Sequence, residues 1–176
     1  MPYKGRIKKK AQELIKSLKL KSAPIPIEDV AKALGAKVIY SPLNDDHSGM
    51  IYAERNGRII IGINSFHHPN RQRFTLAHEI AHLVLHKKDL LEQVHIDKNA
   101  NGRRLNRDNR SSEGEDKMEI EANKFAAELL MPTEMVEKDI KHKSIDIEDE
   151  EAVVKLAKKY QVSVQSMSIK LDSILH

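Results

Sequence analysis

The stretch "RFTLAHEIAHLVLHKK", residues 73–88, places titrating side chains inside an apolar run. Its Leu, Ile, Ala, Val and Phe residues lie on nearly all sides of the helix that the stretch predicts, so we expect a buried helix. Burying charged or titrating groups is costly unless they have a strong partner. His78, Glu79 and His82 therefore need such a partner, and a divalent cation supplies one.

Residues 78–82, "HEIAH", match the H-E-x-x-H pattern of a metal-binding helix. Residues four apart lie on one helix face, with Cβ atoms about 6 Å apart, so both imidazoles can reach one Zn²⁺ at about 2.0–2.1 Å. Glu79 is turned about 100° from His78 and flanks the metal instead of blocking it. The pattern predicts His78 and His82 as metal ligands and Glu79 as the general base that takes a proton from water.

A catalytic zinc site takes three protein ligands and keeps one position open. The chain contains no cysteine, which excludes disulfides and thiolate ligands and leaves His, Asp or Glu for the third position. His86 is eight residues beyond His78, about 12 Å along a straight helix, so we exclude it as the third ligand. We expect it at the helix end or at the lip of a cleft.

The apolar segment "KMEIEANKFAAELL", residues 117–130, predicts a second packed helix that supplies the third ligand. Glu119 and Asn123 are four apart and share a face. Glu119 can bind the metal, while the side-chain oxygen of Asn123 accepts a hydrogen bond from the far nitrogen of a liganding histidine and fixes its orientation. Glu121 is the alternative ligand, but about 200° of rotation turns it away from that face, so we rank Glu119 first.

Composition favours a one-domain, water-soluble chain with an aliphatic core, since aromatics are only 4% of 176 residues. No segment has the apolar stretch of a signal peptide or the roughly 18 residues of a membrane span, so we expect a cytoplasmic protein without membrane contact. The net charge is +4, and the basic residues gather in residues 1–21 and 103–110. Such clusters are typical of solvated helix faces, and direct nucleic-acid binding is the less favoured alternative.

The order of helices, then strands, then helices predicts an α+β fold with a small antiparallel sheet beside two central helices. We interpret residues 1–140 as the main domain with a basic N-terminal helix, and residues 141–176 as a helical appendage with a helix-turn-helix-like outline. Residues 88–117 are predicted to be mostly a surface loop. The remaining expected elements are helices at 5–20, 27–34, 71–87 and 133–143, a strand at 36–40, a hairpin at 48–64 with a two-residue turn at Asn56-Gly57, and two C-terminal helices joined at Val162-Ser163.

"RFTLAHEIAHLVLH" and "EIEANKFAAELLMP", in this order and with a variable loop between them, resemble the ImmA/IrrE family of zinc metallo-endopeptidases. The upstream hairpin "SGMIYAERNGRIIIGINS" is similar too, and the resemblance covers about residues 24–135. It implies a minimal zincin (gluzincin-like) fold with one Zn²⁺ ion. Carried over residue by residue, it implies His78 and His82 as ligands, Glu79 as general base and Glu119 as third ligand.

The resemblance also implies a function. Relatives cleave a helix-turn-helix DNA-binding repressor and so relieve repression, which makes such a repressor the expected substrate. The alternatives are a non-proteolytic anti-repressor or DNA-associated module that keeps a zinc site, and a toxin-like or structural zinc protein. The ligand types would also suit Mn²⁺ or Fe²⁺. Tyr52, His86 and His95 are the candidates for stabilising the oxyanion.

Overall fold

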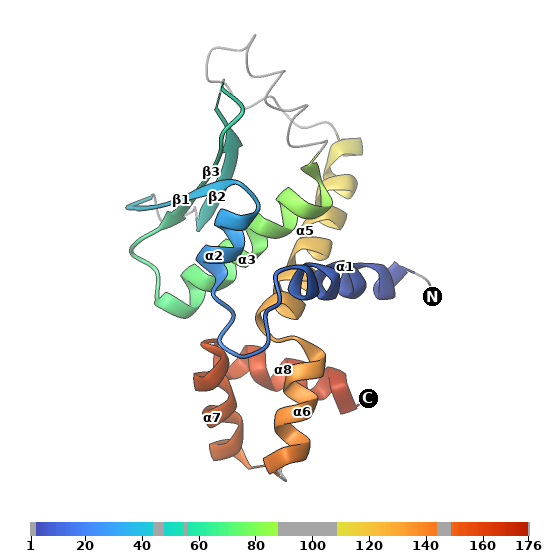
Figure 1. The fold of residues 1–176 in the computed structure, drawn as a ribbon. Coiled ribbons are helices and arrows are strands. Elements are labelled where there is room, and N and C mark those ends of the chain that lie inside the picture. The colour runs from blue at the N-terminus through green and yellow to red at the C-terminus, as the bar shows by residue number, and fades with distance from the viewer. Residues whose placement is uncertain (1–2, 44–47, 55, 88–108, 144–148, 176) are drawn as a thin grey trace.

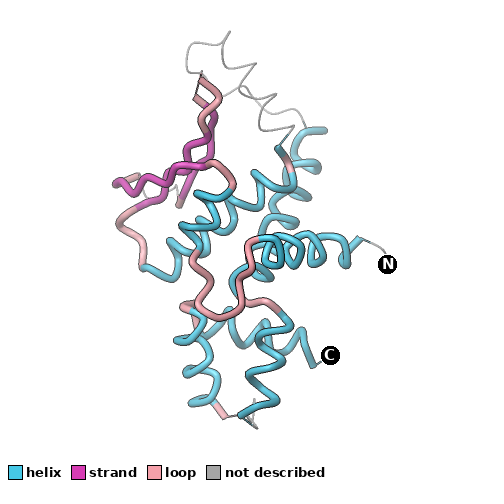
Figure 2. Tube along the Cα trace, in the orientation of Figure 1, coloured by secondary structure: helices cyan, strands magenta, loops and turns pink. Residues whose placement is uncertain are grey.

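A computed structural model shows an α+β fold of seven helices and one three-stranded sheet within its described residues, as the sequence predicted (Figures 1 and 2). The described ranges are residues 3–43, 48–54, 56–87, 109–143 and 149–175. The elements are α1 (Tyr3–Ser17), α2 (Ile27–Ala33), β1 (Ala36–Ser41), β2 (Gly49–Ala53), β3 (Ile59–Asn64), α3 (Pro69–Leu85), α5 (Asn109–Leu130), α6 (Thr133–Lys143), α7 (Glu150–Tyr160) and α8 (Val164–Leu175).

The sheet is mixed, so the expectation of an antiparallel sheet is correct for β2 and β3 and wrong for β1. Its order is β1-β3-β2, with β2 antiparallel and β1 parallel to β3. All six residues of β3, "IIIGIN", are buried. A strand buried on both faces is typical of the centre of a sheet. The hairpin partner β2 occupies one edge of β3, and β1 therefore pairs with the other.

Helix α3 lies between the sheet and α5, which explains why its sequence is apolar on nearly all sides. It contacts β2 and β3 on one side and α5 on the other (Figure 1). Leu76, Ala77, Ile80 and Ala81 are fully buried in these two contacts. Helix α1 packs on α5, and α2 packs on β1 and α3. The sheet, α3 and α5 thus form successive layers, with the H-E-x-x-H helix in the middle.

The ends of α3 follow from local sequence. Pro69 occupies the first turn, where a missing N–H costs nothing, and the Nδ1 atom of His68 accepts a hydrogen bond from the Asn70 N–H at 3.2 Å. His86 is the C-terminal cap, and its N–H donates to the carbonyl of His82 at 2.9 Å. These boundaries place His78 inside the helix and His82 in its last turn.

Helix α5 begins at Asn109, eight residues before the start predicted from the sequence. The prediction of a mostly surface loop over 88–117 was therefore wrong for its last part, and residues 88–108 lie outside the described residues. Hydrophobic periodicity detects only the part of a helix that packs. Asp116 and Lys117 are exposed, so this turn of the helix carries no apolar pattern to detect.

The hairpin turn also differs from the two-residue turn expected at Asn56-Gly57. The N–H of Gly57 donates to the carbonyl of Glu54 at 2.9 Å, and the N–H of Glu54 donates to the carbonyl of Arg58 at 2.8 Å. These bonds close a three-residue loop, in which Gly57 has the positive φ of +82° that glycine adopts at little cost. The hairpin itself and its flanking strands lie where the sequence predicted them.

Helices α6, α7 and α8 gather at the opposite end of the molecule from the sheet (Figure 1). Helices α7 and α8 pack on each other, and Gln161 ends α7 in the left-handed conformation, close to the predicted joint. The proposed division between residues 140 and 141 stays a prediction. None of the helices in the described part of the chain combines the length and apolar character needed to cross a membrane.

Candidate metal centre

Two imidazoles of α3 face the same point. Because His78 and His82 are separated by one helical turn, their side chains leave the same side of α3. Their Nε2 atoms lie 3.0 Å apart, and their ring planes are inclined by 70°. Both side chains are largely buried, with 16% and 12% of their area exposed. The helix geometry expected from the sequence is therefore present.

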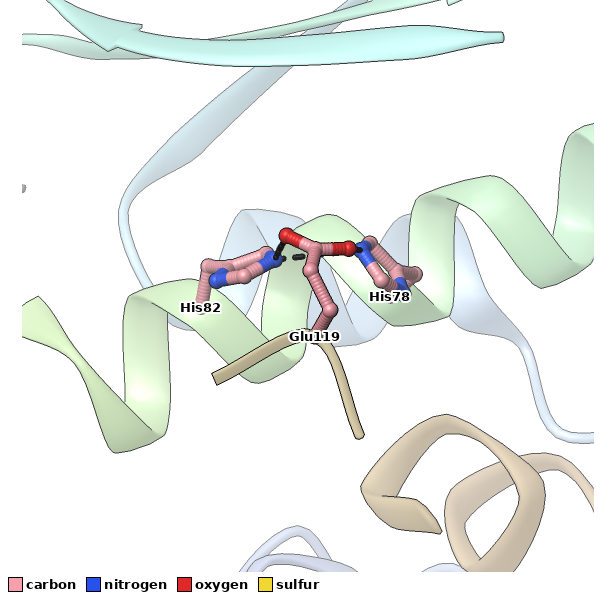
Figure 3. A group of neighbouring side chains, drawn as sticks. All are labelled: His78, His82 and Glu119. Atoms are coloured by element: carbon pink, nitrogen blue, oxygen red, sulfur yellow. Dashed lines mark hydrogen bonds and ion pairs between the residues drawn. The ribbon is translucent and has the colours of Figure 1, made fainter. Parts of the chain in front are cut away.

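Glu119 of α5 brings its carboxylate to these two nitrogens (Figure 3). Its Oε2 atom lies 3.1 Å from Nε2 of His78, and its Oε1 atom lies 3.2 Å from Nε2 of His82. The side chain of Glu119 is 56% exposed, so the group opens to solvent on this side. His82 and Glu119, which are 37 positions apart in the chain, thus meet because α3 and α5 pack together.

The three residues fit a bound cation. They offer ligand atoms that all lie within 4.8 Å of one another. For ligand bonds of about 2.0–2.1 Å, tetrahedral ligands lie roughly 3.3 Å apart, close to the separations of 3.0–3.2 Å found here. Lone pairs of two imidazoles and a carboxylate repel when they point at one another, unless a proton or a cation lies between them. Two His and one Glu are ligand types that Zn²⁺ prefers, and that Mn²⁺ and Fe²⁺ also accept.

Asn123 fixes the orientation of His78. The Nδ1–H of His78 donates to Oδ1 of Asn123 at 3.0 Å, since an amide oxygen can only accept. With the proton on Nδ1, the Nε2 lone pair of His78 points toward His82 and Glu119. This is the contact that a metal-binding histidine makes with its other nitrogen, and Asn123 supplies it from α5.

Glu79 lies beside the group without joining it. Its side chain is buried, with 8% of the residue exposed. Burial raises the pKa of Glu79 to about 7, with a smaller contribution from the negative charge of Glu119. A carboxylate whose pKa is near neutrality can both accept and return a proton at physiological pH. The site therefore holds an acid–base group next to three candidate ligands.

The imidazole of His82 is neutral at physiological pH, which is the protonation state that a metal ligand requires. Burial lowers the pKa of His82 to about 4, and the neighbouring His78 adds to the effect. A histidine with this pKa is neutral at pH 7, so its nitrogen lone pair is available to a metal without prior loss of a proton.

Three other residues considered from the sequence lie outside the candidate ligand group. Glu121 is buried and pairs with His86, with 3.6 Å between Oε2 and Nε2, and neither belongs to the candidate ligand group. His86 lies at the helix end, the first of the two places expected for it, and its buried side chain faces Glu121 of α5. Tyr52 alternates with Ile51 along β2 and lies on the sheet face away from α3. His95 lies outside the described residues.

Sequence reasoning missed Gly49, the first residue of β2. A Cβ atom there would lie 2.5 Å from Cγ2 of Thr75 and 3.4 Å from Oε1 of Glu79. Strand β2 therefore reaches the candidate base only because residue 49 has no side chain. The available signal was a glycine at the start of a strand, which often marks a close approach of the backbone to another group.

Comparisons with known proteins identify two similar chains and a matching family. A segment of 79 residues is 44% identical to the "Radiation response metalloprotease IrrE" of Deinococcus deserti, covering 44% of this chain and 24% of that protein. A solved "Mycobacterium tuberculosis transcriptional regulator" superposes with a TM-score of 0.61 over 93% of this chain and 45% of that chain. At 12% identity, this second likeness shows the fold alone.

The chain thus spans about a quarter of the curated relative and under half of the solved structure. The family match is broader, because the model of the IrrE N-terminal-like domain aligns with residues 31–172. That range includes both central helices and every candidate ligand. The resemblance noted in the sequence is confirmed, and the chain belongs to the IrrE N-terminal-like family of metallopeptidases.

Proposed function

We propose that the protein is a zinc-dependent endopeptidase that hydrolyses a peptide bond in a regulatory protein. The observation that carries the proposal is the convergence of His78, His82 and Glu119, with Glu79 buried beside them. Three protein ligands and an adjacent carboxylate are the parts that metal-assisted hydrolysis requires. Family membership supports the same chemistry.

Zinc, when bound by these three residues, would supply a Lewis acid that polarises the scissile carbonyl. Glu79 takes a proton from the attacking water as the water oxygen bonds to the carbonyl carbon. It then delivers that proton to the amine nitrogen as the C–N bond breaks, which leaves a carboxylic acid and a free amine. Asn123 keeps the Nε2 atom of His78 directed toward His82 and Glu119, where the ion would be held.

We further propose that the substrate peptide lies along β2. This strand is an edge of the sheet, since β3 alone pairs with it among the described strands. An extended peptide can add to such an edge through backbone hydrogen bonds. Gly49 of β2 lies against Glu79, so a peptide on this edge would pass close to the candidate base.

The proposed substrate is a helix-turn-helix DNA-binding repressor, whose cleavage would relieve repression. The basis is the resemblance carried by "HEIAH" and "EIEAN". The similar solved structure is described as a transcriptional regulator, which fits a role in gene control.

The test is incubation with the repressor encoded beside this protein, read by mass spectrometry for a specific cut. We expect cleavage by the wild-type protein with Zn²⁺, and none after chelation or in the Glu79→Gln variant. The variant should still bind metal, because Glu79 is outside the ligand group. Cleavage that survives Glu79→Gln would refute the assignment of the base.

A second candidate is a DNA-associated module that acts by contact. The observation that favours it is the outer face of α1, where Arg6, Lys8, Lys9 and Lys16 are exposed. Binding to phosphates by such a face would weaken steeply as salt is added. DNA affinity with this salt dependence, unchanged by chelation and accompanied by no cleavage, would favour this candidate over the endopeptidase.

A further inference from the structure

A buried histidine–glutamate pair joins the two helices that carry the candidate metal ligands. His86 ends α3 and Glu121 lies on α5, and each residue is 8% exposed. Nε2 of His86 lies 3.6 Å from Oε2 of Glu121, a separation of an ion pair when the imidazole is protonated and slightly too long for a hydrogen bond. Neither residue has an assigned role in the proposed reaction. Their burial therefore calls for another explanation, because a carboxylate is costly to remove from water.

His86 is in contact with the candidate ligand His82. The two ring centroids lie 5.5 Å apart, and the planes are tilted by 51°. The backbone N–H of His86 also caps the carbonyl of His82 at 2.9 Å. The side chain of His86 thus packs against the imidazole of His82, one turn farther along the same helix.

Glu121 lies on α5, two residues after the candidate ligand Glu119, and faces His86. The side chain of Glu119 is 56% exposed, so few contacts of its own hold its carboxylate in place. Its position depends mainly on how α5 sits against α3. Glu121 is buried in that contact, and its Oε1 atom has no hydrogen-bond partner among the described residues. A buried pair of this kind contributes little net stability, and in some proteins such a pair specifies the geometry of the contact around it.

We infer that His86 and Glu121 are positioning residues that align α5 with α3, and so hold Glu119 at bonding distance from His78 and His82. They act through the ligands and do not themselves bind the ion. The inference rests on the proposed metal site and adds a determinant of its affinity. Asn123 holds α5 to His78 at one end of the ligand group, and Glu121 holds α5 to His86 at the other.

The test measures the zinc dissociation constant of purified protein by competition with a chromophoric chelator. The variants are His86→Ala, Glu121→Gln and the double variant, each checked for folding by circular dichroism. We expect each single variant to bind zinc about 10-fold more weakly, the lower end of the effect of residues that support ligands. The double variant should lose little more than either single variant, because both break the same link.

Two further variants separate positioning from general destabilisation. His86→Gln keeps a polar group near the place of Nε2 and should recover most of the affinity that His86→Ala loses. Glu128→Gln removes another buried carboxylate of α5, which contacts Lys170 and Thr133 away from the ligands. It should lower thermal stability and leave zinc affinity unchanged.

The outcomes distinguish this inference from the metal site on which it rests. A wild-type protein that binds no zinc would refute the site and the inference together. A wild-type protein that binds zinc, with His86→Ala and Glu121→Gln binding it equally well, would refute the inference alone. Equal losses in Glu128→Gln and Glu121→Gln would also refute it, since the effect would then be one of stability.

Discussion

Glu79 combines a role in the proposed reaction with a cost to the fold. It is a buried carboxyl group whose pKa is raised to about 7, first by burial and then by Glu119. In the metal-free protein, the folded state therefore holds a proton on Glu79 between about pH 4.5 and pH 7, whereas the unfolded chain releases it. Stability falls with rising pH wherever the folded state binds more protons.

We predict that the metal-free Glu79→Gln variant gains stability over the wild type as the pH rises through this window. The glutamine amide does not titrate, so the variant escapes the cost of charging a buried carboxyl, up to about 3 kcal/mol. Urea unfolding of both metal-free proteins at about pH 5 and about pH 8 measures the difference. Parallel pH profiles would contradict the raised pKa.

Asn123 gives a second prediction at the scale of one residue. Asn123→Ala removes the acceptor of the His78 Nδ1–H, so His78 can rotate or change tautomer. We expect zinc affinity to fall about 10-fold, as for other partners of liganding histidines. Lys124→Ala is the matched control, since Lys124 is an exposed neighbour on α5, and it should bind zinc as the wild type does. Equal affinities of the two variants would show that the Asn123 contact does not support the ligand.

Residue geometry within one helix could be predicted from the sequence, and contacts between helices could be predicted only in part. The positions of His78, Glu79 and His82 follow from helical rotation alone. Rotation also ranked Glu119 over Glu121, and Glu119 is the one that lies with the histidines. The pairing of Glu121 with His86 depends on how two distant helices pack, which rotation along either helix does not give.

At the scale of elements, the approach of β2 to α3 carries a prediction. Gly49→Ala would place Cβ 2.5 Å from Cγ2 of Thr75, closer than packed atoms tolerate. We expect a loss of about 1–3 kcal/mol in the free energy of unfolding and weaker peptide cleavage, because β2 must move away from Glu79. Thermal unfolding and a peptidase assay measure both.

The second-site variant Thr75→Ser tests the cause, since serine lacks the Cγ2 atom. We expect the Gly49→Ala, Thr75→Ser double variant to recover part of the lost stability. The matched control is Gly5→Ala on α1, where no atom lies within 4 Å of the added Cβ, and this variant should lose no stability. Failure of Thr75→Ser to improve Gly49→Ala would show that the close approach is not the cause.

Elements with an apolar pattern were predictable, and polar extensions and strand direction were not. The two central helices and the hairpin contain clear apolar segments, "LAHEIAHLVL", "NKFAAELL" and "IIIGIN". The N-terminal turns of α5 are polar and give no such signal. The parallel pairing of β1 with β3 depends on which edge of β3 remains after the hairpin forms, and the side-chain pattern of β1 is the same for either direction.

At the scale of the whole molecule, one buried network joins four helices. Nζ of Lys170 on α8 lies 2.6 Å from Oε2 of Glu128 on α5 and 2.9 Å from Oγ1 of Thr133 at the start of α6. Gln12 of α1 donates to Oε1 of Glu128 at 3.3 Å. The C-terminal helix α8 is thereby attached to the helix that carries Glu119.

We predict that Lys170→Ala lowers the free energy of unfolding by about 3–5 kcal/mol, since it leaves the Glu128 carboxylate buried without its cation. Chemical denaturation measures the loss. Lys155→Ala is the matched control, because Lys155 pairs with Glu151 across an exposed helix face, and it should cost less than about 1 kcal/mol. Similar losses in the two variants would contradict a structural role for the buried network.

This network could not be predicted from the sequence, because Lys170 and Glu128 are 42 residues apart and each reads as an ordinary surface residue of a helix. The order of the helices within the described residues could be predicted, since each carries its own apolar residues. The division between residues 140 and 141 remains a prediction.

The central claim is that His78, His82 and Glu119 hold one metal ion, and native mass spectrometry tests it most directly. After incubation with Zn²⁺ and removal of the excess, the account predicts one ion per chain in the wild type and in Glu79→Gln. It predicts none in Glu119→Ala and a retained ion in Glu121→Ala. A wild type without bound zinc, or a Glu119→Ala variant that keeps its ion while Glu121→Ala loses it, would contradict the account.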